Sequence, residues 1–285
     1  MADNASRGAV LISGASTGIG RACAERLGSG GFTVFAGVRK QEDADSLAGA
    51  GSGRIQPLML DVTEPESIAT AMRTVDAGSP GGLAGLVNNA GVSAGGPLEF
   101  VALDEWRRAL EVNFLGQVAL TQAALPALRK ARGRVVNMTS IGGRLASPFL
   151  GPYNASKYAL EAVTDALRLE LRHFGIEVAA VEPGAVATPI WEKAEATAAQ
   201  ATNDMPAEAL QLYGAGFAAI SRFVSEGERA GVPPDDVARV VEHALTASRP
   251  KTRYVVGRDA KMRLLLTRLL PTRVMDRVVV RAMGL

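Results

Sequence analysis

Short apolar runs alternate with amphipathic segments along almost the whole chain. The apolar runs are mostly continuous, which is typical of strands covered on both faces in a parallel sheet. We predict strands at residues 9–13, 33–38, 55–60, 85–90, 134–139, 177–182 and 253–257. Between them, apolar positions with a helical period predict helices at 18–29, 64–77, 104–130, 152–174 and 234–248.

This alternation favours an α/β fold of the Rossmann type: a parallel, doubly wound seven-stranded sheet with helices on both faces. No repeat, low-complexity linker or change of composition divides the chain, so we expect residues 1–285 to form a single domain. Residues 189–232 break the rhythm, since they are rich in Ala and hold no strand. We expect a flap over a substrate there, at the sheet edge where such folds bind ligands. A helix pair that only packs is the alternative.

Composition narrows the class of protein. The chain is 47% hydrophobic and 21% charged, which is ordinary for a globular protein. The single cysteine, Cys23, excludes an intramolecular disulfide and is expected to be a small buried hydrophobe. His173 and His243 have no Cys or second His nearby, so no metal site is expected. Without a signal-peptide pattern or a run long enough to span a bilayer, the cytoplasm is the expected location.

The net charge of +2 conceals a basic C-terminal segment. Residues 249–285 hold ten Lys or Arg and two Asp, a charge of +8, so the preceding residues carry −6. We expect a basic helical extension at about 258–285, divided into two short helices by Pro271. It would cap an apolar pocket, pack against a second subunit, or lie on an anionic membrane surface; peripheral membrane contact is not favoured. Nucleic-acid binding is not expected, because aliphatic residues separate the basic ones.

A glycine-rich turn, SGASTGIG at 13–20, joins the first predicted strand to a predicted helix. Glycines permit a tight turn and let backbone N–H groups approach a pyrophosphate at the positive end of the helix. The spacing of Gly14, Gly18 and Gly20 differs from the commonest dinucleotide fingerprint and from a P-loop. At this place in the chain it nevertheless favours a dinucleotide cofactor.

The end of the second strand bears on which nicotinamide cofactor binds. The sequence there is Val38-Arg39-Lys40, with no carboxylate before Glu42. A guanidinium grips a 2′-phosphate through two parallel hydrogen bonds, whereas a carboxylate would repel it. NADP(H) is therefore favoured. NAD(H) is the alternative if Arg39 simply faces solvent.

Several short motifs resemble, in order and spacing, those of the short-chain dehydrogenase/reductase (SDR) family over residues 8–260. They are SGASTGIG (13–20), LDVT (60–63), NNAG (88–91), VN (112–113), NMTS (137–140), YNASK (153–157) and PGAVAT (183–188). The later segments TRYVVGRDAK and LLPTRVMDRVV resemble the retinol and hydroxysteroid dehydrogenase-like branch. Two positions depart from the pattern. Thr17 stands where members that prefer NADP(H) often have a basic residue, and Ser13 replaces the usual Thr.

The resemblance implies a catalytic set of Asn113, Ser140, Tyr153 and Lys157. Tyr153 would be the general acid for carbonyl reduction or the base for alcohol oxidation, and Ser140 would hydrogen-bond the substrate oxygen. Lys157, one helical turn after Tyr153, would stabilise the phenolate, lower the tyrosine pKa and hold the nicotinamide ribose. Asn113 would hold a water that links Lys157 to solvent.

The resemblance also implies the cofactor contacts. Besides Tyr153 and Lys157, they are Gly14, Ser16, Thr17, Gly18, Ile19, Gly20, Arg39, Asp61, Val62, Asn89, Ala90, Gly91, Pro183, Gly184, Val186 and Thr188. Asp61 and Val62 would meet the adenine, residues 89–91 would line the adenosine and ribose side, and residues 183–188 would cradle the nicotinamide and pyrophosphate.

The predicted function is an NADP(H)-dependent oxidoreductase that interconverts a hydrophobic ketone or aldehyde and its alcohol by hydride transfer. Apolar residues of the flap and of the segment after Ser140 indicate the hydrophobic substrate; they include Leu145, Phe149, Leu150, Leu212, Tyr213, Phe217, Ile220 and Phe223. Three alternatives stay open: an NAD(H)-linked alcohol dehydrogenase of the same family, a dehydratase or epimerase on the same fold, and a non-catalytic dinucleotide-binding sensor or scaffold. A homodimer or homotetramer is expected by analogy.

Overall fold

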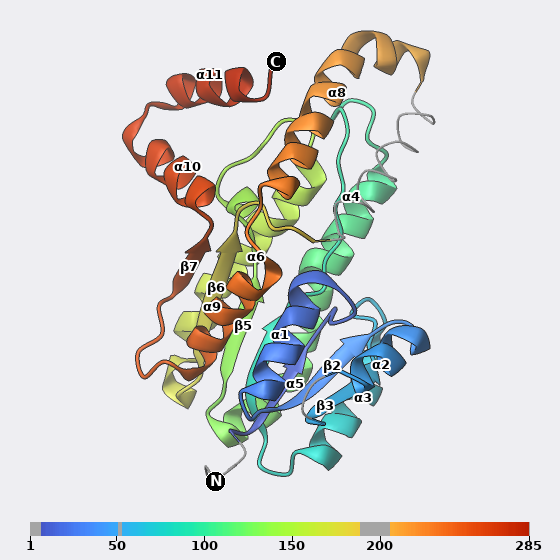
Figure 1. Ribbon diagram of the computed structural model, residues 1–285, viewed down its shortest axis with the longest axis vertical. Coiled ribbons are helices and arrows are strands. Elements are labelled where there is room, and N and C mark those ends of the chain that lie inside the picture. The colour runs from blue at the N-terminus through green and yellow to red at the C-terminus, as the bar shows by residue number, and fades with distance from the viewer. Residues whose placement is uncertain (1–6, 51–52, 189–205, 285) are drawn as a thin grey trace.

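The computed structural model describes residues 7–50, 53–188 and 206–284. Seven parallel strands form one sheet in the order β3-β2-β1-β4-β5-β6-β7, and helices cover both of its faces (Figure 1). The strand order reverses between β1 and β4, which is the switch point where doubly wound sheets bind ligands. The predicted fold class is confirmed.

Each observed strand agrees with a predicted one to within two residues at either end. The strands are β1 Ala9–Ile12, β2 Thr33–Val38, β3 Ile55–Met59, β4 Leu83–Asn88, β5 Arg134–Met138, β6 Glu177–Pro183 and β7 Arg253–Val256. All six pairings between neighbours are parallel. Their carboxyl ends therefore meet along one edge of the sheet.

The described helices depart from prediction at three places. The described helices themselves are α1 Gly18–Ser29, α2 Gln41–Ala48, α3 Pro65–Gly78, α4 Leu103–Leu110, α5 Gly116–Ala131, α6 Gly151–Glu170, α8 Ala207–Arg229, α9 Pro234–Thr246, α10 Arg258–Leu269 and α11 Thr272–Ala282. Helix α2 was not predicted, because it is polar and buries only Ala44 and Leu47. The helix predicted at 104–130 contains a π-helical turn, η1 Glu111–Leu115. The helix predicted at 152–174 ends at Glu170, and a 3₁₀ turn, η3 Arg172–Phe174, follows.

The sheet separates two hydrophobic layers. Successive side chains of β1 point to opposite faces, so Val10 and Ile12 join one layer and Leu11 joins the other. Helices α1, α2 and α9 complete the first layer, and α3 and α5 complete the second. Cys23 is fully buried in the first layer, where burial raises its pKa to about 12. It is the small buried hydrophobe that the sequence predicts.

The segment after β6 leads away from the carboxyl ends of the strands. Of the predicted flap, residues 189–205 lie outside the described residues, and α8 forms most of the remainder. Figure 1 shows α8, α10 and α11 at the end of the molecule toward which the strands point. Helices α10 and α11 are separated at Pro271, as predicted. Of the helices that the structure describes, none has the length and hydropathy to cross a bilayer.

Candidate active site

A cavity of about 1550 Å³ lies at the carboxyl ends of the strands. Its wall comes from the loops after β1, β2, β4, β5 and β6 and from α6, α8, α10 and α11. Pockets for a single small molecule typically measure about 300–1000 Å³. This cavity therefore has room for a dinucleotide and a second molecule beside it. Every residue predicted to contact cofactor or substrate at the glycine-rich turn, the strand ends and α6 lines it, whereas Asn113 does not.

The glycine-rich turn leaves no space for a side chain at two positions. Gly14 has a φ of +66°, and a Cβ there would lie 2.7 Å from the Cα of Ala90. A Cβ on Gly20 would collide with the carbonyl oxygen of Gly14 and with the side chain of Asn89. The glycines therefore let the turn pack directly on the loop after β4, while the turn and the start of α1 line the cavity, where a helix N-terminus suits a pyrophosphate.

Two polar side chains tie the turn to the loop after β4. The Ser13 hydroxyl accepts hydrogen bonds from the N–H groups of Asn89 and Ala90, each at 3.0 Å. The Asn89 amide donates to the carbonyl oxygens of Ser13 and Gly14 at 3.0 and 2.9 Å. The retained hydroxyl at position 13 thus joins two cofactor-binding loops, a role that the sequence did not reveal.

We expect Gly20→Ala to weaken binding of the dinucleotide by at least about tenfold, because the new methyl group displaces the Gly14 carbonyl from the turn. Titration of the purified variant with reduced nicotinamide cofactor, followed by fluorescence, measures this loss. Gly214→Ala is the matched control, since it lies in α8 and a Cβ there meets nothing within 4 Å. Equal affinity in the two variants would contradict the assignment of the turn.

The end of β2 presents basic side chains to the cavity. Arg39 is exposed, lines the cavity and has no ion pair among the described residues. Lys40 instead pairs with Glu42 at 3.0 Å. Glu42 and Asp43, in the first turn of α2, also line the cavity. Arg39 is therefore free to bind an anion, and the carboxyl-bearing residues Glu42 and Asp43 line the same cavity.

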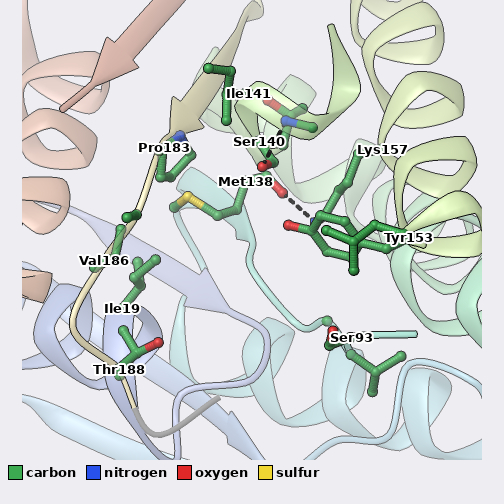
Figure 2. A pocket seen from close by; sticks show the side chains of 18 of the residues that line it. Ile19, Ser93, Met138, Ser140, Ile141, Tyr153, Lys157, Pro183, Val186 and Thr188 are labelled. Atoms are coloured by element: carbon green, nitrogen blue, oxygen red, sulfur yellow. Dashed lines mark hydrogen bonds between the residues drawn. The ribbon is translucent and has the colours of Figure 1, made fainter. Parts of the chain in front are cut away.

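Ser140, Tyr153 and Lys157 converge in the cavity, opposite Ile19, Val186 and Thr188 (Figure 2). Helix α6 begins beside Pro152 and places Tyr153 and Lys157 one turn apart. Ser140 follows β5, and its hydroxyl accepts a hydrogen bond from the N–H of Gly142 at 3.0 Å. The Ser140 hydroxyl is the polar group that acts on the Tyr153 phenol, and both residues line the cavity. This places two hydroxyls together where a carbonyl oxygen could accept from both.

Burial shifts the pKa values of both Tyr153 and Lys157. Burial raises the pKa of Tyr153, and the hydrogen bond from Ser140 opposes the shift. Burial lowers the pKa of Lys157 to about 8, while Glu161 opposes that shift. The Lys157 Nζ donates to the carbonyl oxygen of Met138 at 2.9 Å and lies 5.9 Å from the centroid of the Tyr153 ring. Burial is thus the largest influence on the tyrosine pKa in the protein without a cofactor, and its lowering by Lys157 stays a prediction.

Asn113 is fully buried in the π-helical turn η1. Its Oδ1 accepts from the N–H of Val92 at 2.7 Å, and its Nδ2 donates to the Val92 carbonyl at 2.9 Å and to the Ser156 hydroxyl at 3.0 Å. The Ser156 hydroxyl donates in turn to the carbonyl of Tyr153 at 2.7 Å. Asn113 thus couples the loop after β4 to the start of α6. π-Helical turns often occur at functional sites. Its water-holding role stays a prediction.

A buried ion-pair network behind the site was missed by sequence reasoning. The fully buried Glu182 carboxylate at the end of β6 lies 3.2 Å from both Arg144 and Arg253. Arg253 in β7 also reaches Glu161 of α6 at 3.0 Å. Buried charges persist only when paired. The network joins the segment after Ser140, helix α6 and strands β6 and β7. The only signal in the sequence was a charged residue within the apolar runs of β6 and β7, Glu182 and Arg253.

The other end of the cavity has an apolar wall. It includes Leu145, Leu150, Ile220, Phe223, Val224, Leu266, Met275, Val278, Val279 and Met283. Four residues of the predicted apolar surface do not line it: Leu212 is exposed, Tyr213 donates to Glu99 at 2.8 Å, and Phe149 and Phe217 pack against each other. Helix α11 contributes side chains instead. Within the described residues, no group of three or more His, Cys, Asp or Glu could hold a metal.

Comparison with known proteins assigns this arrangement. Residues 8–199 match the short chain dehydrogenase family. The chain belongs to this family. Human retinol dehydrogenase 5 (Homo sapiens) is 39% identical over 284 residues, covering 96% of this chain and 88% of the relative. The NADPH-dependent 3-dehydrocapnine reductase of Ornithobacterium rhinotracheale is 36% identical over 274 residues, covering 94% of each chain. A short-chain dehydrogenase structure from Streptomyces avermitilis superposes with a TM-score of 0.74 at 30% identity, covering 94% of this chain and 97% of its own.

Membership in this SDR family establishes the general chemistry. The protein is an NAD(P)-dependent oxidoreductase that acts on CH–OH groups. The similarity to retinol and 17-beta-hydroxysteroid dehydrogenases confirms the branch to which the C-terminal segments pointed.

Proposed function

We propose that this SDR enzyme interconverts a hydrophobic ketone or aldehyde and its alcohol with NADP(H) as the hydride carrier. One observation carries the proposal. The neighbouring hydroxyls of Ser140 and Tyr153 lie in a single cavity between the glycine-rich turn and an apolar wall from α8, α10 and α11. A dinucleotide on the turn and an apolar molecule against the wall would both reach these hydroxyls.

The residues present fit the cofactor. The turn after β1 offers backbone N–H groups, Arg39 offers a free guanidinium, and Lys157 offers an ammonium beside Tyr153. The bound nicotinamide supplies or accepts the hydride. The name of the bacterial relative, an NADPH-dependent reductase, supports NADPH as the donor.

The chain's own residues then handle the proton and the substrate oxygen. Tyr153 donates its phenolic proton to the carbonyl oxygen during reduction and takes it back during oxidation. The Ser140 hydroxyl donates to the same oxygen and stabilises the negative charge that develops on it. Charged Lys157, one helical turn away, favours the phenolate that remains. Asn113 holds Val92 and Ser156 in place around this pair.

Helices α8 and α11 would cover the substrate. Both contribute apolar side chains to the cavity wall, which supports the capping role for the basic extension over the membrane alternative. A homodimer or homotetramer through α4, α5 and α6 fits the large apolar side chains that α4, η1 and α6 expose: Leu103, Leu115, Tyr158 and Leu169. Size measurement by light scattering tests this assembly.

NAD(H) is the second candidate cofactor. Its support comes from Glu42 and Asp43, whose carboxylates line the cavity close to Arg39 and would disfavour a 2′-phosphate. A direct comparison of the two cofactors separates the candidates.

We expect NADPH to bind at least about tenfold more tightly than NADH, because the Arg39 guanidinium forms charge-assisted hydrogen bonds to the 2′-phosphate. Arg39→Asp should abolish or invert this preference. Arg73→Asp is the control, since it makes the same charge change on the exposed face of α3. Fluorescence titration of all three proteins with both cofactors gives the dissociation constants. Equal binding of NADPH and NADH by the unaltered protein would contradict the Arg39 assignment and favour NAD(H).

Turnover with a hydrophobic carbonyl such as a steroid ketone or retinal tests the reaction. Reduction consumes the reduced nicotinamide, so its absorbance falls as the alcohol accumulates. Formation of product with no net change in that absorbance would instead indicate dehydration or epimerisation.

A further inference from the structure

Helix α10 brings an arginine, Arg263, into the wall of the substrate end of the cavity. The helix starts two residues after β7. Its buried residues Ala260 and Leu264 pack against Ile141 and Leu145, which follow Ser140 in the chain. The helix is thus fixed to the same loop that holds the catalytic serine. Arg263, next to Leu264, lines the cavity that Ser140 and Tyr153 also line.

The surroundings of Arg263 are apolar. Its guanidinium carbon lies 5.7 Å from the centroid of the Phe223 ring, and Phe223 belongs to the cluster of α8 and α11 that covers the cavity. Among the described residues, no carboxylate forms an ion pair with Arg263. Asp259, one turn earlier, is the nearest acidic group that acts on it, and its carboxylate lies against Gly184 and Gly257 instead.

Two other half-buried arginines, Arg144 and Arg253, are each paired with a carboxylate. Arg144 and Arg253 each have a side chain that is 28% exposed, and each reaches the buried carboxylate of Glu182. Arg263 is also half-buried, but its guanidinium lies over the ring of Phe223 and not beside a carboxylate. Burial lowers its pKa, which reflects the cost of holding the cation there. A desolvated cation that faces a ligand cavity and stacks on an aromatic ring is suited to bind an anion.

We propose that Arg263 binds an anionic group of the substrate, so that the substrate is a hydrophobic carbonyl or alcohol that carries a carboxylate or similar oxyanion. This inference rests on the proposed function and specifies its substrate class. The oxyanion sits on the guanidinium between α8 and α10, and the apolar body lies along Phe223, Leu266 and the residues of α11. The carbonyl is then directed toward Ser140 and Tyr153.

Binding of two matched twelve-carbon probes tests the inference without turnover. Calorimetric titration in the presence of NADP⁺ should show dodecanoate binding at least about tenfold more tightly than 1-dodecanol, since only the carboxylate gains a charge-assisted pair. Arg263→Met should remove this difference. Arg268→Met, an exposed position of the same helix, should retain it. Equal affinity of the two probes for the unaltered protein, or a preference that survives in Arg263→Met, would overturn the inference.

A second comparison separates this inference from the proposed function. The unaltered protein should reduce 12-oxododecanoic acid with a higher kcat/KM than its methyl ester, and the gain should reside mainly in KM. Reduction of the ester as efficient as that of the acid would leave the oxidoreductase function standing and overturn the role of Arg263. Selective binding of dodecanoate with no reduction of either aldehyde would uphold the anion site and count against the proposed carbonyl chemistry.

Discussion

Tyr153→Phe is expected to lower kcat for carbonyl reduction by about 10²- to 10⁴-fold, the range that a positioned general acid contributes. The variant keeps the aromatic ring that α6 holds in the cavity wall and removes only the hydroxyl, on which Ser140 acts. Binding of the reduced cofactor should be nearly unchanged, because the glycine-rich turn and Arg39 are untouched. Steady-state kinetics with a hydrophobic ketone, together with cofactor titration, measures both quantities.

Tyr158→Phe is the matched control for this variant. Tyr158 stands on the same helix, is 44% exposed and does not line the cavity. Each variant thus loses one tyrosine hydroxyl from α6, and only Tyr153 lines the cavity. If Tyr153→Phe retained the kcat of the unaltered protein, the general-acid assignment would be wrong, and a water held by neighbouring polar groups would have to deliver the proton.

The strands were predictable because a parallel sheet covered on both faces needs continuous apolar runs, as in β1 and β6. The missed elements are those whose conformation depends on distant contacts. Helix α2 has only two buried side chains, so its sequence carries almost no periodic signal. The π-helical turn at Asn113 exists where the amide binds both backbone groups of Val92, a residue 21 positions away. No local pattern encodes such a contact.

The site was predictable to the extent that a motif fixes its own geometry. The spacing of Tyr153 and Lys157 on one helix and the glycines after β1 needed no tertiary information. The ion pairs of Glu182, the tie made by Ser13 and the position of Arg263 arise from segments far apart in the chain. The same is true of the charge state of Lys157, which depends on how deeply the folded protein buries it.

Lys157→Met is expected to make the protein more stable near pH 7 and nearly inactive. Burial lowers the pKa of this lysine to about 8 from 10.5, so below pH 8 the native state holds a charged ammonium at a cost. A shift of this size corresponds to about 3 kcal/mol, and loss of the hydrogen bond to Met138 subtracts about 1 kcal/mol. The free energy of unfolding should therefore rise by about 2 kcal/mol in the variant, while kcat/KM falls by at least about 100-fold.

The pH dependence identifies the cause of the gain. Between pH 8 and 10.5 the unfolded chain binds a proton at Lys157 that the native protein has lost, so the stability of the unaltered protein rises with pH in this window. The advantage of Lys157→Met should then shrink from pH 7 toward the upper end of the window. Urea unfolding at both ends of the window, with exposed Lys261→Met as the control, measures this difference in stability.

A variant less stable than the unaltered protein at pH 7 would mean that the Met138 hydrogen bond outweighs the burial of the charge. Lys157 would then contribute to both stability and catalysis. The expected result means instead that its charge lowers the free energy of unfolding and is kept for catalysis.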